Sequence, residues 1–333
     1  MDLTPTPESL DIRDTVGALV SEMGTESIDA GDTMLRERAD ELGLSLLLVP
    51  ESLGGLELDL STAVLVLEML GRRPTRLPWI TDIVAVPTLF SNIGHLSSVH
   101  PLAEASASSS QRFALARPIQ HRGCRTQRVD LADAVLDIRG DRLSTWTAHS
   151  WHPTTERSLT GHVDLWTTDA DSTSVGPLPR GETTRVINAA RTAAAAFVLG
   201  AARAALDLAV EHAKNREQFG RPIGSFQAVK HLLASAMESI TMAAPLIPAA
   251  AHASTTNQAC AAIDAALALR QCSKAAVESV HTAIQVHGAI GYTDETALGG
   301  LLAQVEATRD YWGPAGLISD EIAESLLNGS MPR

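Results

Sequence analysis

Hydrophobic positions recur with a helical period at both ends of this chain. Near the N-terminus, Leu35, Leu42 and Leu46 fall on one stripe, which is the spacing of an amphipathic helix. Toward the C-terminus the stripes are longer and rich in alanine, so the helices that carry them could approach one another closely. The pattern predicts helices within about 10–90 and again over 194–208, 229–240 and 262–284.

The stretch from about 103 to 185 has a different pattern. It opens on the serine run Ser106 to Ser110 and holds short apolar segments that are of strand length. We therefore predict a mostly α-helical fold with a small central β domain. The expected domains are a helical one at 1–102, a shortened β domain at 103–185 and a helical bundle at 186–333. The expected strands lie within Phe113–Ala116, Ala134–Ile138 and His162–Trp166.

Composition narrows the class of protein. A net charge of −13 without a run of Lys or Arg argues against nucleic acid and anionic membrane surfaces as partners. No uninterrupted apolar stretch approaches the roughly 20 residues that span a bilayer, and the N-terminus lacks the pattern of a secretion signal. We expect a cytoplasmic protein without a membrane partner. Three scattered cysteines and scattered histidines favour neither disulfides nor a metal site.

Two segments of the predicted bundle carry candidate chemistry. The loop Arg216–Gln227 reads R-E-Q-F-G-R-P-I-G-S-F-Q, and Gln285–Tyr292 reads Q-V-H-G-A-I-G-Y. The guanidinium of Arg216 offers a planar fork of donors that matches a pyrophosphate. Gly288 would let backbone N–H groups come close to such a ligand, and nearby glutamines offer neutral donors and acceptors. A plainer interpretation is that Arg216 only caps the preceding helix and that Gln285 only faces solvent.

These segments, together with V-P-E-S-L-G-G over Val49–Gly55, resemble the acyl-CoA dehydrogenase family. The family patterns are R-x-Q-F-G-x-P-I…F-Q, Q-x-x-G-G-x-G-[YF] and V-P-E-x-x-G-G. The resemblance implies an N-terminal helical domain, a β-barrel-like middle domain and a C-terminal four-helix bundle. It also implies FAD as cofactor and an electron-transfer flavoprotein as acceptor in the α,β-dehydrogenation of an acyl-CoA thioester.

In this family the two C-terminal segments reach across a subunit interface and hold the adenosine diphosphate half of a neighbour's FAD. The resemblance therefore implies that this chain contacts a cofactor in trans, with Phe219 as an apolar wall. The cofactor-binding residues so implied are Arg216, Gln218, Phe219, Gln227, Gln285, Gly288 and Ala289.

The segments that hold the flavin ring within one subunit of the family are altered here. Phe113–Pro118 stands in place of the T-E-P-x-x-G-S-D loop, but the glutamate is missing and no Gly-Ser-Asp follows in Ile119–Arg125. The candidate for the K-x-W-I-T strand, Arg142–Thr147, keeps only its tryptophan, Trp146. The sequence indicates that the chain's own ring-binding loop is lost.

The catalytic glutamate of the family also has no counterpart. Counting from Gln285–Tyr292 places Trp312 at the glutamate of the family's Y-E-G-T segment, and the position used by other members holds Ala190. A short insertion near Arg309 would move the first position to Ile318, close to Glu321. Removing a proton α to a thioester requires a nearby carboxylate with a raised pKa. The sequence thus predicts no catalytic residue in this chain.

Three hypotheses follow from this pattern. The first is a subunit without a base, in a heteromeric enzyme whose complete paralogous subunit carries the glutamate and shares its FAD. It resembles the short subunit of actinobacterial α2β2 steroid-degrading acyl-CoA dehydrogenases, so the resemblance implies a steroid acyl-CoA ester as substrate. The second is an autonomous dehydrogenase with a relocated base at Glu321 or Glu306. The third is a flavin-free scaffold or CoA-binding protein.

Overall fold

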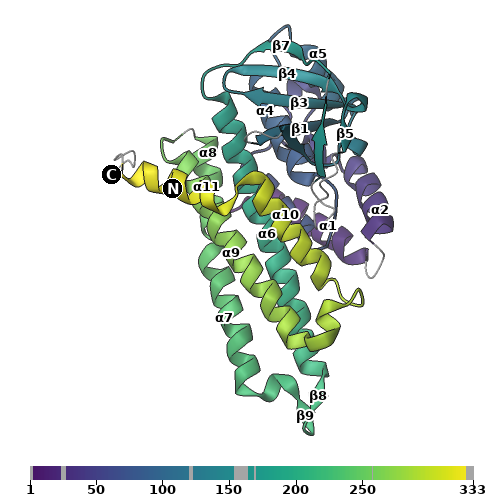
Figure 1. Ribbon diagram of the computed structural model, residues 1–333, viewed down its shortest axis with the longest axis vertical. Coiled ribbons are helices and arrows are strands. Elements are labelled where there is room, and N and C mark those ends of the chain that lie inside the picture. The colour runs from purple at the N-terminus through teal and green to yellow at the C-terminus, as the bar shows by residue number, and fades with distance from the viewer. Residues whose placement is uncertain are drawn as a thin grey trace.

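The computed structural model describes residues 3–23, 28–119, 123–153, 164–168, 170–256 and 258–327. Helices occupy both ends of the chain and a twisted sheet lies at one end of the molecule (Figure 1). The N-terminal helices are α1 (Pro7–Glu22), α2 (Ile28–Glu41), α3 (Leu60–Leu70), α4 (Val86–Ile93) and α5 (His100–Ala107), with a π-helical turn, η3 (Thr81–Ala85), before α4.

Short polar side chains begin two of these helices, α1 and α3. Thr6 accepts a hydrogen bond from the backbone N–H of Ser9 at 3.1 Å, and Asp59 accepts one from that of Thr62 at 2.9 Å. Each bond satisfies an N–H that has no partner within its own helix. The first turn of α1 is tied to that of α3 through a 2.8 Å bond between the Ser9 and Thr62 hydroxyls.

The C-terminal part is an extended helical bundle around one long central helix. Helix α6 has 34 residues, and its alanine-rich middle is buried on all sides. Helix α9 packs along it, and α7 and α10 flank the pair (Figure 1). The helices of this part are α6 (Glu182–Asn215), α7 (Gln227–Ala243), α8 (Leu246–Thr255), α9 (Ala261–His287), α10 (Leu298–Trp312) and α11 (Ala315–Leu327).

Two glycines let α3 and α6 touch through their backbones. A Cβ atom on Gly71, at the end of α3, would lie 2.0 Å from the carbonyl oxygen of Phe197, and one on Gly200 would lie 2.0 Å from that of Glu68. Only hydrogen fits at either place, so the N-terminal helices and the bundle are locked together by direct backbone contact.

Among the described residues, the central strands form a seven-stranded sheet in the order β5-β6-β2-β1-β3-β4-β7. Strands β1 and β3 run parallel, and the other neighbouring pairs are antiparallel. Gly140, with φ of 59°, makes the turn between β3 and β4. The strands are β1 (Phe113–Ile119), β2 (Gly123–Thr126), β3 (Ala134–Arg139), β4 (Arg142–Thr147), β5 (His152–Pro153), β6 (Asp164–Thr167) and β7 (Thr173–Pro177).

The expected fold class is confirmed: helices at both ends enclose a small β region in sequence order. The three expected strands match β1, β3 and β6, although residues 162 and 163 of the third lie outside the described part. The domain boundaries at 102 and 185 stay a prediction.

Two helical stretches are long and apolar enough to cross a membrane by length and composition. The expectation that no stretch reaches this length, which rested on uninterrupted apolar runs, is corrected to that extent. In 182–215 the apolar window is 78% buried, as in the core helix of a globular protein, whereas in 227–255 it is 22% buried. The second stretch is α7 with α8, and it leaves the large apolar side chains of Leu232, Met237 and Met242 exposed. That no membrane is involved stays a prediction.

Candidate functional site

A small hairpin closes the end of α6 that lies farthest from the sheet (Figure 1). Strands β8 (Glu217–Gln218) and β9 (Arg221–Pro222) pair through Gln218 and Arg221, leaving Phe219 and Gly220 as the two-residue loop. Both loop residues have positive φ, 53° and 76°, which is the geometry of a type I′ turn. This geometry suits the glycine but strains the phenylalanine by about 1 kcal/mol.

Phe219 is placed at the tip of this hairpin with 92% of its surface exposed. Its ring meets that of Phe226 edge to face at 6.2 Å, and the Arg221 guanidinium lies over Phe226 at 4.2 Å. An exposed aromatic ring on a strained backbone gains nothing from burial within its own chain. Backbone strain at a residue that is not buried in its own chain, such as Phe219, is typical of a ligand-binding site.

Arg216 stands where α6 passes into the hairpin. Its backbone N–H bonds to the carbonyl of His212 at 2.8 Å, so the main chain of Arg216 does cap the helix. The guanidinium forms no hydrogen bond or ion pair with any residue that the structure describes, and the side chain is exposed. The two interpretations of Arg216 are therefore compatible, because the backbone caps while the side chain faces solvent.

The second segment lies at the C-terminal end of α9, beside the hairpin. Gly288 ends α9 with φ of 67° and ψ of −138°, a conformation open to glycine alone, and its N–H bonds to Gln285 and Ile284 carbonyls. No atom lies within 4 Å of where a Cβ of Gly288 would be, so the glycine faces open space. The chain then continues as a short 3-10 turn, η7 (Gly288–Tyr292).

The structure gathers the predicted cofactor residues at one end of the bundle. Two belong to the hairpin region, one starts α7 and three belong to the α9–η7 junction, while Arg216 joins α6 to the hairpin. Every one is exposed in the single chain: Arg216, Gln218, Phe219, Gln227, Gln285, Gly288 and Ala289. This arrangement can meet a ligand outside the chain, with one guanidinium, three amides and an aromatic wall, and so fits a phosphate-bearing cofactor held elsewhere.

At the other predicted site, Trp312 is fully buried at the end of α10. The Arg117 guanidinium lies over its ring at 5.5 Å, and Arg191 donates from Nε to its carbonyl oxygen at 3.2 Å. The neighbouring Tyr311 donates from its hydroxyl to the carbonyl of Leu115 on β1. The position counted for the catalytic base is thus occupied by packed core.

The alternative positions for a base are also filled or paired. Ala190 and Ile318 are both buried. Glu321 accepts two hydrogen bonds from Arg191, at 2.6 and 3.0 Å, and Glu306 pairs with Arg309 at 2.9 Å. An arginine that holds a carboxylate through both oxygens occupies the atoms that would have to take a proton from a substrate.

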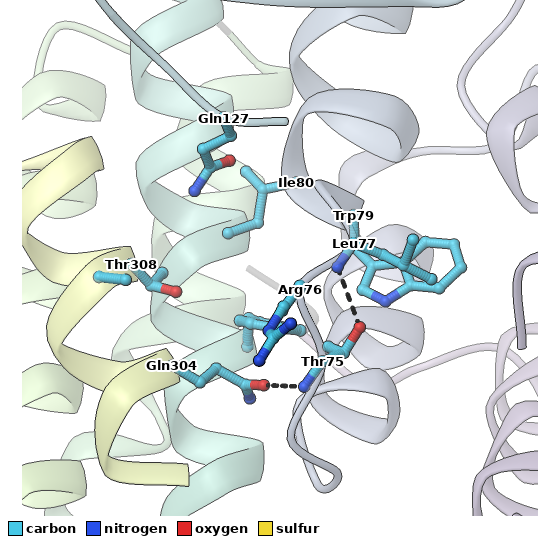
Figure 2. A pocket seen from close by; sticks show the side chains of 10 residues that line it. Thr75, Arg76, Leu77, Trp79, Ile80, Gln127, Gln304 and Thr308 are labelled. Carbon is cyan, nitrogen blue, oxygen red and sulfur yellow. Dashed lines mark hydrogen bonds between the residues drawn. The ribbon is translucent and has the colours of Figure 1, made fainter. Parts of the chain in front are cut away.

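The space between the N-terminal helices and the bundle is small. A cavity of about 20 Å³ lies there, one or two helical turns along α10 from Trp312 (Figure 2). Gln304 spans it, accepting from the Thr75 N–H and donating to the Gly71 carbonyl, both at 2.9 Å. Such a volume holds roughly one water molecule and no acyl chain. Its lining includes Arg76, Trp79, Gln127 and Thr308, which face the cavity from three parts of the chain.

The altered middle segments are structural. Phe113–Pro118 lies within β1, where Phe113–Ala116 pair with β3 and the next two residues pair with β2, so a strand stands in place of the ligand loop. Residues 120–122 lie outside the described part. Trp146 donates from Nε1 to the Ala170 carbonyl at 3.2 Å and packs edge to face on Trp151, with centroids 5.3 Å apart. The described residues of these two segments therefore serve strand pairing and packing within the middle region.

Comparison with known proteins agrees with this architecture. Residues 182–327 match the family described as acyl-CoA dehydrogenase, C-terminal domain. The chain is 31% identical over 303 residues to acyl-CoA dehydrogenase IpdE2 of Mycobacterium tuberculosis, covering 88% of this chain and 89% of that one. These matches define the class: the chain belongs to the acyl-CoA dehydrogenase family.

Solved structures share the fold over the whole length. The ChsE4-ChsE5 complex from Mycobacterium tuberculosis superposes with a TM-score of 0.84 at 22% identity, with all of both chains covered. The steroid ACAD Tcur3481-Tcur3483 superposes with a TM-score of 0.80 at 21% identity, covering 97% of this chain and 98% of that one. At these identities the likeness concerns the fold.

Sequence reasoning missed two features of the site. Arg117 and Arg191 converge on Trp312 from β1 and α6, and nothing in the local spacing of either arginine indicates this. His212 and His287 stack at the cofactor end, with ring centroids 4.2 Å apart. Their places, four residues before Arg216 and one before Gly288, could have marked them because each borders a predicted cofactor residue.

Proposed function

We propose that this chain is the subunit without a catalytic base in a heteromeric FAD-dependent acyl-CoA dehydrogenase. A complete paralogous subunit supplies the base and binds FAD, and this chain lends its exposed residues to that FAD in trans. The observation that carries the proposal is a contrast within one chain. The cofactor-facing residues are all exposed, while Trp312 fills the position of the base.

When bound, FAD supplies the hydride acceptor for the α,β-dehydrogenation of an acyl-CoA thioester. The role of this chain is placement. Arg216 supplies a fixed positive charge for the pyrophosphate, and its guanidinium is ready because no described group of its own chain engages it. Phe219 covers an apolar part of the cofactor, and the three glutamines hydrogen-bond polar groups around it. Together they exclude water and hold the cofactor in register with the reacting carbons.

A subunit of a heteromer needs a surface that its partner covers. Helix α7 leaves Leu232, Met237 and Met242 exposed in the single chain, and the apolar window of this stretch is 22% buried. Association with another subunit along α7 would remove apolar area from water at about 25 cal/mol per Å². A shared end of the bundle and an unburied apolar helix beside it are what a subunit interface requires.

The substrate class is an extension of the same proposal. IpdE2 and the steroid ACAD Tcur3481-Tcur3483 motivate a steroid acyl-CoA ester, with an electron-transfer flavoprotein as acceptor and the cytoplasm as location. The acyl group would lie in the partner's site, since the cavity of about 20 Å³ beside α10, the one near the position of the base, cannot hold one.

The test is flavin stoichiometry in the chain with and without its partner. Expressed alone, the chain should retain little FAD, and co-expressed with its complete paralogue it should give about one FAD per heterodimer.

In that complex, Arg216→Ala should lower the affinity for FAD by about 10- to 100-fold, as expected for a lost charge-assisted contact. Arg142→Ala is the matched control, because Arg142 is an exposed arginine on β4, at the sheet end of the molecule. A yellow, active homo-oligomer would contradict the proposal.

Glu321 supports one specific alternative, because it lies next to the position of the base, held by Arg191. If this chain were an autonomous dehydrogenase with Glu321 as base, an active homo-oligomer would exist and Glu321→Gln would abolish its turnover. If it were a flavin-free scaffold, Arg216→Ala would change neither the flavin content nor the turnover of any partner.

A further inference from the structure

Two histidines connect the hairpin to the Gly288 segment. His212 lies on the last turn of α6 and His287 is the last residue of α9. Their rings stack with centroids 4.2 Å apart and an interplanar angle of 24°. The two helices bring their ends together at this contact, so the stack joins the two parts of the proposed cofactor surface.

Each ring is tied to one of the two segments. The carbonyl of His212 accepts the Arg216 N–H at 2.8 Å, so any shift of His212 moves the start of the hairpin. His287 Nδ1 lies 2.8 Å from the Ala283 carbonyl, which fixes the ring along α9 and places the proton of its neutral form on Nδ1. The η7 turn folds tightly over His287, since a Cβ on Gly291 would lie 3.1 Å from that of His287.

The surroundings of His212 favour its neutral ring. Burial lowers the pKa of His212, and His287 and the Arg216 guanidinium lower it further. Because the folded chain then binds fewer protons than the unfolded chain, the junction is most stable above the ordinary histidine pKa of about 6.5 and loses stability as pH falls below it. The other ionisable groups on the surrounding segments are Glu211 and Lys214 on α6, Glu217 and Arg221 on the hairpin, Lys230 and His231 on α7, His281 on α9 and Tyr292 on η7.

We propose that His212 and His287 are positioning residues whose neutral stack holds Arg216 and Gly288 at the spacing that the neighbour's FAD requires. This inference rests on the proposed function. Neutral imidazoles attract one another when stacked, whereas two imidazolium rings 4.2 Å apart beside Arg216 repel. Protonation therefore separates the two segments, and FAD retention falls as pH falls.

The experiment measures release of FAD from the co-purified complex between about pH 8 and about pH 5.5, a range that spans histidine titration. We expect the apparent dissociation constant to rise about tenfold, equivalent to one pKa unit of coupling. In His212→Phe the ring and its stacking area remain but the charge cannot form, so this part of the pH dependence should vanish. His281→Phe is the matched control because His281 is exposed on α9, six residues before His287, and it should behave as the unmodified complex does. An unaltered pH profile in His212→Phe overturns the proposal.

A second measurement separates this proposal from the proposed function. If the complex holds no FAD at any pH, the trans role fails, yet the junction is still present in the chain alone. The protection factors of amides in 216–222 and 285–292, corrected for the intrinsic exchange rate at each pH, should then fall at low pH in the unmodified chain and not in His212→Phe. Equal exchange in the two proteins at every pH would reject the positioning role on its own.

Discussion

Arg191 donates two hydrogen bonds to Glu321, from Nη1 to Oε2 at 2.6 Å and from Nη2 to Oε1 at 3.0 Å. The pair joins α6 to α11, and the same guanidinium reaches the backbone of Trp312 at the end of α10. Arg191 is 7% exposed, and Glu321 balances its largely buried charge. Glu321, a candidate base by its place in the sequence, thus takes part in a contact that joins α6, α10 and α11.

Glu321→Gln should therefore destabilise the chain. The loss should be about 1–2 kcal/mol, below the cost for a fully buried pair because the Glu321 side chain is half exposed. Urea unfolding of the chain measures it. Glu324→Gln, on the same helix and exposed, is the control and should leave the midpoint unchanged. Turnover of the complex should survive both changes, and a collapse of turnover in Glu321→Gln alone would favour the relocated base.

Replacing Trp312 tests whether its position belongs to the core or to a site. Trp312→Ala should cost about 3–5 kcal/mol, as for other large buried aromatics. Trp312→Glu, which restores the family's residue type, should destabilise at least as much because it buries a carboxylate. Neither variant should give the isolated chain dehydrogenase activity. A stable Trp312→Glu variant that turns over an acyl-CoA would show that the rest of a working site is present. Trp146→Ala is the comparison, with a smaller loss since Trp146 is only partly buried.

Glycine contacts between α3 and α6 give a prediction with its own control. Gly200→Ala would bring a Cβ to 2.0 Å from a backbone oxygen, so the helices must separate, at a cost of several kcal/mol that thermal unfolding should detect. Gly299→Ala, on α10 with nothing within 4 Å, should instead stabilise by about 0.5–1 kcal/mol through helix propensity. Equal effects of the two substitutions would mean that α3 and α6 do not touch.

Phe219 should show opposite effects on stability and on binding. Phe219→Asn suits the type I′ turn and should stabilise the isolated chain by about 1 kcal/mol, because asparagine tolerates positive φ. In the complex the same change should weaken FAD binding through loss of the aromatic wall. Unfolding of the chain and flavin titration of the complex measure the two effects. Loss of stability in the chain alone would show that the ring packs within its own subunit.

The helical part of the fold was predictable because long periodic stripes determine helices locally. The stripes at 194–208, 229–240 and 262–284 lie within α6, α7 and α9. The sheet order and the parallel pairing of β1 with β3 were not, since strand pairing depends on contacts between distant residues and short apolar runs carry no register. The break between α7 and α8 at Ala244 and Pro245 also went unpredicted, although the proline could have indicated it.

The candidate site was likewise predictable from the sequence only in part. Arg216 and Gly288 could be found because each sits in a contiguous pattern with a local physical reason. The contact between His212 and His287, and the convergence of Arg117 and Arg191 on Trp312, depend on how helices meet in space. Residue spacing within one helix does not predict which residues of another helix it will contact.

The glycine contacts between α3 and α6 also limit how this subunit can move. Helices that touch backbone to backbone cannot slide past each other without breaking contact. The N-terminal helices and the bundle therefore move as one rigid body. Closure over a substrate by hinging between these two parts is unavailable to this chain. In the proposed heteromer, opening and closing during turnover therefore falls to the partner subunit, while this subunit stays rigid.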